Sequence, residues 1–211
     1  DGHSRFAYGF KRPACREPPM SKLHLIRHGP THAKTMVGWS DLPADLSDHA
    51  ALARLRSALP SDAVMVSSDL IRASATADAV GSGQLRLPNQ PELREINFGD
   101  WELKSFNQIN ADDPDRVFEY FDAPGKIAPP NGENWLEFSA RINAAVDRLM
   151  AEHQGKELII VVHFGVIISQ IQRAEGASPK RALRHAIDHL SLTQISFENG
   201  TWDIHRINYA A

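Results

Sequence analysis

Residues 23–31, with the sequence LHLIRHGPT, join an apolar, strand-like run to an abrupt change of character. The run ends in Arg27 and His28, and Gly29 and Pro30 then interrupt any regular backbone. In open α/β sheets, ligands bind at the carboxyl ends of the strands. The segment therefore predicts a strand over residues 23–27 that delivers an arginine and a histidine to a binding site.

These residue types together favour phosphoryl chemistry. The guanidinium of Arg27 is a fixed, always-charged fork of donors that matches phosphate oxygens. The imidazole of His28 is a nucleophile that works near neutral pH. Gly29 has no side chain, and we expect it to let a bulky substrate approach the backbone. The pattern suggests an enzyme that moves a phosphoryl group onto histidine.

Four later segments follow this one in a recognisable order, and the resemblance runs from about residue 21 to at least residue 166. The set resembles the histidine phosphatase superfamily, also called the phosphoglycerate mutase-like family, and within it the short bacterial-type phosphatases. The five matching segments are RHGPT at 27–31, SSDLIRASATA at 67–77, LREINFGDWE at 93–102, PNGEN at 130–134 and VVHFG at 161–165.

The periodicity of the chain predicts an α/β fold. Strands alternate with helices, and an Asn-Gly pair at 199–200 joins the last two strands as a hairpin. The resemblance implies the same class, a three-layer α/β/α sandwich with a mostly parallel sheet. We expect strands over 23–27, 63–67, 84–87, 158–163, 192–198 and 201–207, and helices over 47–59, 69–80, 103–110, 114–121, 134–153, 165–174 and 178–187. The buried side of helix 134–153 is expected to carry Leu136, Ile142, Ala145, Val146 and Leu149.

Length and charge limit the classes of function. A chain of 211 residues forms one domain, expected over 20–211 with a small cap insertion at about 100–131. Residues 1–19, rich in Arg, Lys and Pro, are expected to be an extension or tag outside the fold. The net charge of −3 argues against nucleic-acid binding, and no apolar run approaches the roughly 20 residues needed to cross a membrane. The single Cys15 excludes internal disulfides and favours the cytoplasm.

The candidate site residues follow from both lines of reasoning. His28 is expected to be the nucleophile, held through its second ring nitrogen by a group such as a backbone carbonyl. Arg27 and Arg72 are expected to bind the phosphate, with Arg72 near the positive end of a helix. His163, after a buried strand, is expected to donate to the phosphate. The resemblance implies that Glu95 is the general acid and base, with Glu102 and Glu133 as rival carboxylates.

The sequence also departs from the family pattern. Lys34 stands where asparagine is frequent, Phe164 replaces the first glycine after the second histidine, and Asn134 replaces a serine. We expect Lys34, the hydroxyl of Thr31 and the backbone N–H of Phe164 to contact phosphate. The Phe164 ring is expected to narrow the pocket or stack on a substrate.

Histidine spacing raises a metal site as an alternative. His24, His28 and His32 are four residues apart, as are His185 and His189. The first three fall on a predicted strand followed by Gly-Pro rather than on a helix, and the last two lack a third ligand. We therefore expect neither a metal nor a cofactor.

The function expected from sequence is metal-independent hydrolysis of a small phosphorylated metabolite through phospho-His28. Two alternatives stay open: a phosphoglycerate mutase-type phosphotransferase, and a phospholigand-binding module without turnover. The short insertion and its acids, Asp112, Asp113, Asp115 and Glu119, favour hydrolysis. The substrate stays open among α-ribazole phosphate, whose phosphatases have a loop similar to residues 38–43, sugar phosphates and phosphoproteins. A monomer and a homodimer are both compatible with the sequence.

Overall fold

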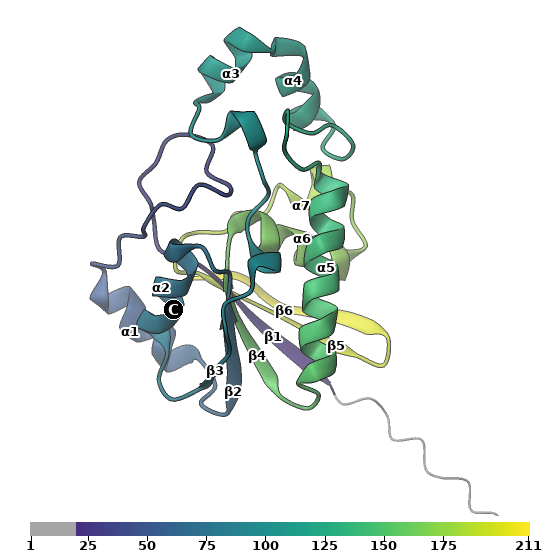
Figure 1. The fold of residues 1–211 in the computed structure, drawn as a ribbon. Helices are drawn as coiled ribbons and strands as arrows, with labels where there is room; N and C mark the ends of the chain where they lie inside the picture. The colour runs from purple at the N-terminus through teal and green to yellow at the C-terminus, as the bar shows by residue number, and fades with distance from the viewer. Residues whose placement is uncertain (1–19) are drawn as a thin grey trace, which may run out of the picture.

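A six-stranded sheet with the order β3-β2-β4-β1-β5-β6 forms the centre of the computed structural model, which describes residues 20–211 (Figure 1). Strands β1 to β4 pair in parallel, whereas β5 pairs antiparallel with β1 and with β6. The predicted mostly parallel sheet is confirmed, and the expected extension at 1–19 lies outside the described residues. The strands are β1 (Ser21–Arg27), β2 (Ala63–Ser67), β3 (Leu85–Arg86), β4 (Glu157–Val162), β5 (Leu192–Glu198) and β6 (Thr201–Tyr209).

Helices cover both faces of the sheet, as the three-layer prediction requires (Figure 1). Side chains of β4 alternate between two buried clusters, because successive residues of a strand point to opposite faces. Ile159 and Val161 pack with α1 (His49–Ala58) and α2 (Ile71–Val80). The other face packs against α5 (Trp135–Glu152) and α6 (Phe164–Glu175). The central strands are thus buried on both sides.

The long helix α5 begins at a capping box formed by Asn134 and Glu137. The Asn134 side chain accepts from the Glu137 N–H at 2.9 Å, and the Glu137 carboxylate accepts from the Asn134 N–H at 3.1 Å. Asparagine and serine are both preferred N-caps. The departure from the family pattern at Asn134 therefore preserves the start of the helix.

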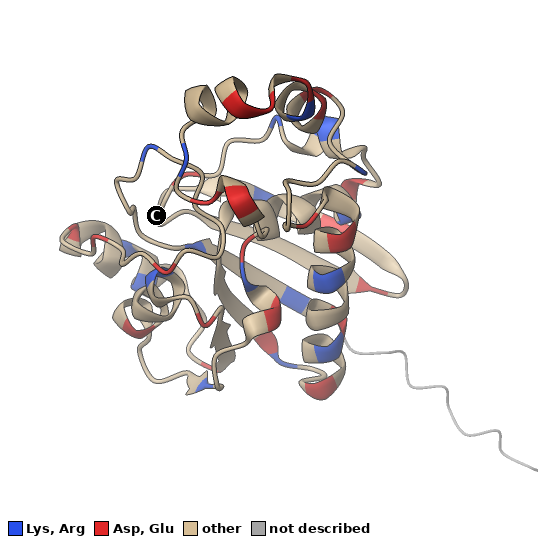
Figure 2. Ribbon diagram, turned by 45° about the horizontal axis from the view of Figure 1, so that its top comes forward, with Lys and Arg blue, Asp and Glu red and all other residues tan. Residues whose placement is uncertain are grey.

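Two short helices, α3 (Phe106–Asp112) and α4 (Pro114–Asp122), lie beyond the end of the sheet, at the top of Figure 1. They share a small buried cluster of Trp101, Ile109 and Val117, separate from the two main clusters. Single-turn 3₁₀ helices at Pro91–Leu93 and Gly99–Trp101 precede them. Acidic residues lie on both helices (Figure 2).

Three expectations from sequence were wrong. The helix expected over 178–187 ends early, since α7 covers only Pro179–Ala182. The chain leaves the helix so that the Ile187 carbonyl can accept from Arg27 Nη1 at 2.6 Å. The strand expected over 84–87 is only Leu85–Arg86. Leu136, expected in the core, is 49% exposed, because it lies on the outer side of the first turn of α5. The other elements are confirmed, with boundaries shifted by a few residues.

Within residues 20–211, no helix combines the length and the apolar character that a bilayer span requires.

The contrast between Ile142 and Leu136 on α5 gives a test of the packing. Ile142 is completely buried against the sheet, so Ile142→Ala should lower the free energy of unfolding by about 2–5 kcal/mol. Leu136→Ala on the same helix is the control and should change it by less than about 0.5 kcal/mol. Urea denaturation measures both values. Equal losses would contradict the described orientation of α5.

Candidate active site

The parallel pairing of β1 with β4 brings two histidines together. Arg27 lies opposite Val162 in the register, and the His28 N–H donates to the Val162 carbonyl at 3.0 Å. The first residue after β1 is therefore His28, and the first residue after β4 is His163. Their rings meet edge to face, with centroids 5.1 Å apart.

The His28 ring is oriented by its own local backbone. Its Nδ1 lies 2.7 Å from the Gly29 carbonyl oxygen, which can only accept, so Nδ1 carries the proton and Nε2 has a free lone pair. Burial, assisted by the positive charges of Arg72 and Arg27, holds the pKa of His28 well below its ordinary value. The imidazole is therefore neutral near pH 7, as a nucleophile must be.

Gly29 serves a different purpose from the one expected. A Cβ at this position would lie 2.7 Å from the Leu46 side chain and 2.9 Å from the Asp45 carbonyl oxygen. The missing side chain makes room for the loop around residues 44–46 rather than for a substrate.

Arg72 is a buried cation held by backbone carbonyls. Its two terminal nitrogens donate to the Ser40 oxygen at 2.8 Å and to the Gly38 oxygen at 2.6 Å, and its side chain is almost completely buried. Glu102 fixes this loop, because its carboxylate accepts from the N–H groups of Gly38, Trp39 and Ser40 and from the Ser40 hydroxyl. Since the carbonyls are neutral, Arg72 keeps its full positive charge.

Arg27 is held in the same manner from the other side. Its bond to the Ile187 carbonyl leaves the guanidinium 5.5 Å above the Phe164 ring centre, within reach of a cation–π attraction. Two guanidiniums thus flank His28.

Glu95 has a position and an environment suited to proton transfer. It is 7% exposed, and its two oxygens accept from the Gly165 N–H and the Ile96 N–H, each at 3.0 Å. Burial raises the pKa of Glu95 above its ordinary value, in spite of these two bonds and of the nearby arginines. A side chain at residue 165 would displace it, because a Cβ there would overlap a Glu95 oxygen.

The two rival carboxylates have structural partners. Burial opposes ionisation of Glu102, but hydrogen bonds from Ser40 and the loop N–H groups outweigh it and lower its pKa. Glu133 accepts from the Asn97 N–H and pairs with Arg141 at 2.7 Å. Of the three carboxylates, only Glu95 lines the cavity beside His28.

His163 is completely buried at the start of α6. Within residues 20–211, neither of its ring nitrogens has a hydrogen-bond partner, which is unusual for a buried polar group. Its ring lies against His28. An anion bound over His28 would give it a partner.

One cavity of about 510 Å³ collects most of the expected residues. Six of the eight line it directly: Arg27, His28, Thr31, Lys34, Arg72 and Glu95. His163 lies behind His28, and Phe164 lines a second cavity next to Glu95. The Thr31 hydroxyl is 3.4 Å from the Ala33 N–H, and Lys34 is exposed.

His189 also lines this cavity, and the sequence analysis had considered it only as part of a metal pair. Its ring centre is 5.6 Å from that of His28, and burial together with Arg27 lowers its pKa to about 4. The order and direction of the strands account for the position of His189. Because β5 runs antiparallel to β1, with Leu192 opposite Ile26, the residues before β5 lie at the edge where β1 ends.

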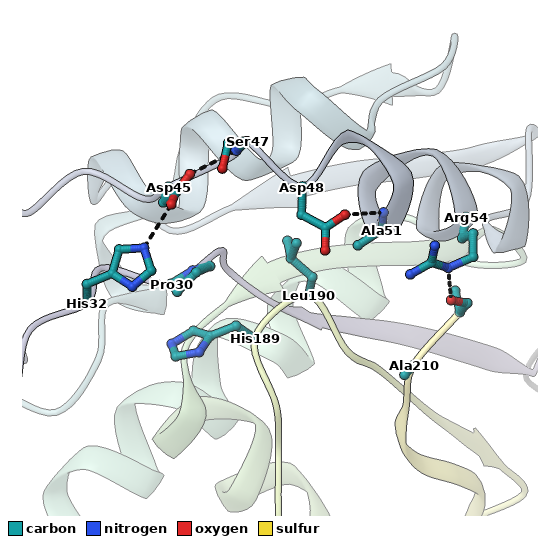
Figure 3. Close-up of a pocket in the computed structure, with 11 residues that line it drawn as sticks. Pro30, His32, Asp45, Ser47, Asp48, Ala51, Arg54, His189, Leu190 and Ala210 are labelled. Atoms are coloured by element: carbon teal, nitrogen blue, oxygen red, sulfur yellow. Dashed lines mark hydrogen bonds and ion pairs between the residues drawn. The ribbon is translucent and has the colours of Figure 1, made fainter.

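The cavity continues past His189 into a neighbouring one of about 350 Å³, which runs toward Asp48 and Arg54 (Figure 3). Pro30, His32 and His189 line both. His32 adopts a left-handed backbone conformation, with φ of 58°, and bonds to Asp45 at 2.8 Å.

Three of the five histidines considered as metal ligands have separate side-chain partners. His24 lies 2.5 Å from Glu157 and 2.8 Å from Gln194, His32 bonds to Asp45, and His185 bonds to Glu175. Within residues 20–211, no group of three or more His, Cys, Asp or Glu side chains is arranged to hold a metal ion.

Comparison with known proteins places this geometry in a family. The model of the histidine phosphatase superfamily (branch 1) matches residues 23–210. The chain belongs to this superfamily. Among solved structures, Bacillus stearothermophilus YhfR matches with a TM-score of 0.82 and 27% identity, over 90% of this chain and 98% of that one.

Two relatives of this chain are named for different activities. The chain is 32% identical over 160 residues to the adenosylcobalamin/alpha-ribazole phosphatase of Salmonella typhimurium, covering 72% of this chain and 78% of that protein. It is 24% identical over 191 residues to the probable phosphoglycerate mutase GpmB of Yersinia enterocolitica, covering 87% and 88%. The family and the fold expected from the sequence are therefore confirmed.

The buried histidines of this superfamily member predict a pH-dependent stability. Burial, together with the neighbouring groups of His28, Arg72 and Arg27, holds the pKa of His163 well below its ordinary 6.5. Below about pH 6.5 the unfolded chain takes up a proton that the folded protein does not, so the free energy of unfolding falls as the pH falls. One such group contributes roughly 1.4 kcal/mol per pH unit.

The measurement is denaturation between about pH 7.5 and about pH 5 for the wild type and His163→Gln. Below pH 6.5, the free energy of unfolding of the variant should fall less steeply with falling pH than that of the wild type, whatever the stability of the variant at neutral pH. His49→Gln, at the exposed start of α1, is the control. An unchanged slope in His163→Gln would mean that this imidazole accepts a proton in the folded state.

Proposed function

We propose that this protein is a phosphomonoester hydrolase that forms a phosphohistidine on His28, with Glu95 as general acid and base. The observation that carries the proposal is the free Nε2 of a neutral His28, flanked by two guanidiniums and facing the same cavity as a buried carboxyl of raised pKa. The relative named as a phosphatase, at 32% identity, supports the same activity.

In the first step, the phosphoryl group binds between Arg27 and Arg72. His163, with no other partner for its ring nitrogens within residues 20–211, donates to a phosphoryl oxygen. His28 Nε2 forms a bond to phosphorus as the bond to the alcohol oxygen breaks. That oxygen takes the proton from Glu95, so the alcohol leaves neutral. The transition state is loose, so the fixed charges supply much of the rate.

In the second step, the Glu95 carboxylate takes a proton from water. The water oxygen attacks phosphorus, the bond from phosphorus to Nε2 breaks, and its electron pair returns to His28. The bond from Nδ1 to the Gly29 carbonyl keeps the ring in position throughout. Arg27, Arg72 and His163 hold the phosphoryl oxygens in both steps, and Thr31, Lys34 and the Phe164 N–H are proposed as further phosphate contacts.

Hydrolysis is favoured over mutase-type transfer. A mutase must keep water from the phosphohistidine and bind an anionic triose, whereas α4 carries Asp115 and Glu119, which have no ion-pair partner within residues 20–211; Asp112 and Asp122 pair with Lys104 and Lys180. Acidic residues of both helices are coloured in Figure 2. Like charges in this region disfavour an anionic leaving group. We propose a small phosphorylated metabolite as the substrate and the cytoplasm as the location, with no nucleic-acid or membrane partner.

The nucleophile is tested by trapping the intermediate. Wild-type protein should hydrolyse an aryl phosphate in excess EDTA, vanadate should inhibit it, and brief incubation with labelled substrate should give an acid-labile phosphohistidine. His28→Ala should lose nearly all turnover and all label, while His49→Ala should retain both. Activity that depends on added zinc or magnesium would overturn the metal-independent mechanism, since the histidines and arginines are proposed to supply the charge.

The acid is tested by the choice of leaving group. Glu95→Gln keeps the shape but cannot exchange a proton, so it should slow alkyl phosphates by about 10²–10⁴-fold. Aryl phosphates leave with little proton help, so they should still phosphorylate His28, and the variant should accumulate phosphohistidine because water is no longer activated. Arg72→Ala is the contrast and should weaken both substrate classes. Equal slowing of both classes by Glu95→Gln would shift the role to Glu102.

A further inference from the structure

Glu95 separates two cavities of opposite character. On one side is the phosphate cavity with its arginines and histidines. On the other side is a cavity of about 150 Å³, here called the aromatic slot, which is lined by Phe98, Tyr120, Phe121, Trp135, Phe164 and Leu183. Among the described residues that line the slot, Glu95 is the only carboxylate, and none is a lysine, arginine or histidine.

The mechanism fixes which cavity receives the alcohol part of the substrate. A general acid must contact the oxygen that it protonates. In the in-line displacement proposed above, that oxygen lies opposite His28, next to Glu95. The alcohol therefore begins at Glu95, where the aromatic slot also begins. This step rests on the proposed function.

The walls of the slot suit a flat apolar group. They come from α4, from the first residues of α5 and α6, from the residue after α7, and from the loops that hold Met36 and Phe98, so segments far apart in the sequence surround the space. Trp135 donates its indole N–H to Gln172 at 2.6 Å and presents only its ring to the slot. Burial and the nearby Glu95 carboxylate raise the pKa of Tyr120, which keeps its hydroxyl protonated.

The size of the slot limits the group that fits. An apolar cavity of about 150 Å³ holds a single benzene ring. Aromatic walls stack on such a ring with favourable edge and face contacts. A sugar or glycerol group would leave most of its hydroxyls without partners there, because Tyr120 and Glu95 supply the only hydroxyl and carboxyl groups among the described lining side chains, and this costs binding.

We propose that the aromatic slot binds a single aromatic ring carried by the alcohol of the substrate, one or two bonds from the ester oxygen. The substrate class is then an arylalkyl phosphomonoester rather than a sugar or glycerol phosphate. The slot acts on specificity, while the arginines and histidines act on any phosphoryl group.

The test compares benzyl phosphate with glycerol 3-phosphate, because both have alkyl leaving groups and need Glu95 alike. For the wild type, kcat/KM for benzyl phosphate should exceed that for glycerol 3-phosphate by about 10- to 100-fold, the value of burying one ring. Phe121→Ser should reduce this ratio by about 3- to 10-fold. Phe118→Ser is the matched control, since Phe118 lies on the same helix and pairs with Phe106 as Phe121 does, but does not line the slot.

A second variant, Leu183→Asn, changes another wall of the slot and should also reduce the ratio. A general loss of activity lowers kcat/KM for both esters and leaves their ratio unchanged. A disturbance of the cap insertion therefore would not produce the expected effect. Equal kcat/KM for the two esters, or a ratio unchanged in both variants, would overturn the proposed specificity.

Binding of benzylphosphonate and methylphosphonate separates the slot from the reaction, because neither compound is hydrolysed. Calorimetry should show tighter binding of benzylphosphonate by the wild type and loss of this preference in Phe121→Ser and Leu183→Asn. If this result holds while neither ester is hydrolysed, the slot stands and the proposed hydrolase function fails. If both phosphonates bind equally while both esters are hydrolysed, the function stands and the slot proposal fails.

Discussion

The parallel pairing of β1 with β4 is the constraint on which the site depends. With Arg27 opposite Val162, the two strands end at the same level, and the first residue beyond each is a histidine. A shift of the register by one residue would turn every side chain of a strand to the other face. The apolar residues of β4, buried on both faces, oppose any such shift because the two clusters require different sets of side chains. The packing of the core thereby fixes the 5.1 Å distance between the His28 and His163 rings.

The charged groups of the site are held by backbone dipoles rather than by opposite charges. Arg72 and Arg27 donate to carbonyl oxygens, and Glu95 accepts from two N–H groups. A carboxylate paired with either arginine would compete with phosphate for it, whereas a carbonyl orients the guanidinium and leaves its charge available. The carboxylate of Glu102 acts one step away, on the loop that supplies those carbonyls.

Sequence reasoning reached the family, the layers of the fold and most of the cavity because these depend on local signals. Apolar runs mark the buried strands, and chain-breaking residues mark the places where Arg27, His28 and His163 follow them. The errors have a common origin in long-range contacts. Helix 178–187 has a helical pattern, but Arg27, 160 residues earlier in the chain, requires the Ile187 carbonyl. His189 gains its place from the antiparallel pairing of β5 with β1, which no local pattern shows. The Phe164 ring was expected to narrow the pocket or stack on a substrate, and it lines the cavity next to the phosphate cavity, where contact with a substrate stays a prediction.

The position of Glu95 between a cationic and an apolar cavity accounts for the raised pKa of its carboxyl group. The arginines and the two N–H donors stabilise the carboxylate, while burial disfavours it, and burial prevails. The aromatic slot contributes to that burial, since its walls keep water from one side of the carboxyl group. A ring that entered the slot would exclude more water and favour the protonated form further. A phosphoryl dianion between Arg27 and Arg72 would offset their positive charges and act in the same direction. In the proposed mechanism, substrate binding would therefore strengthen the protonated state of Glu95 at the step that requires an acid, and departure of the alcohol would restore the conditions for a base.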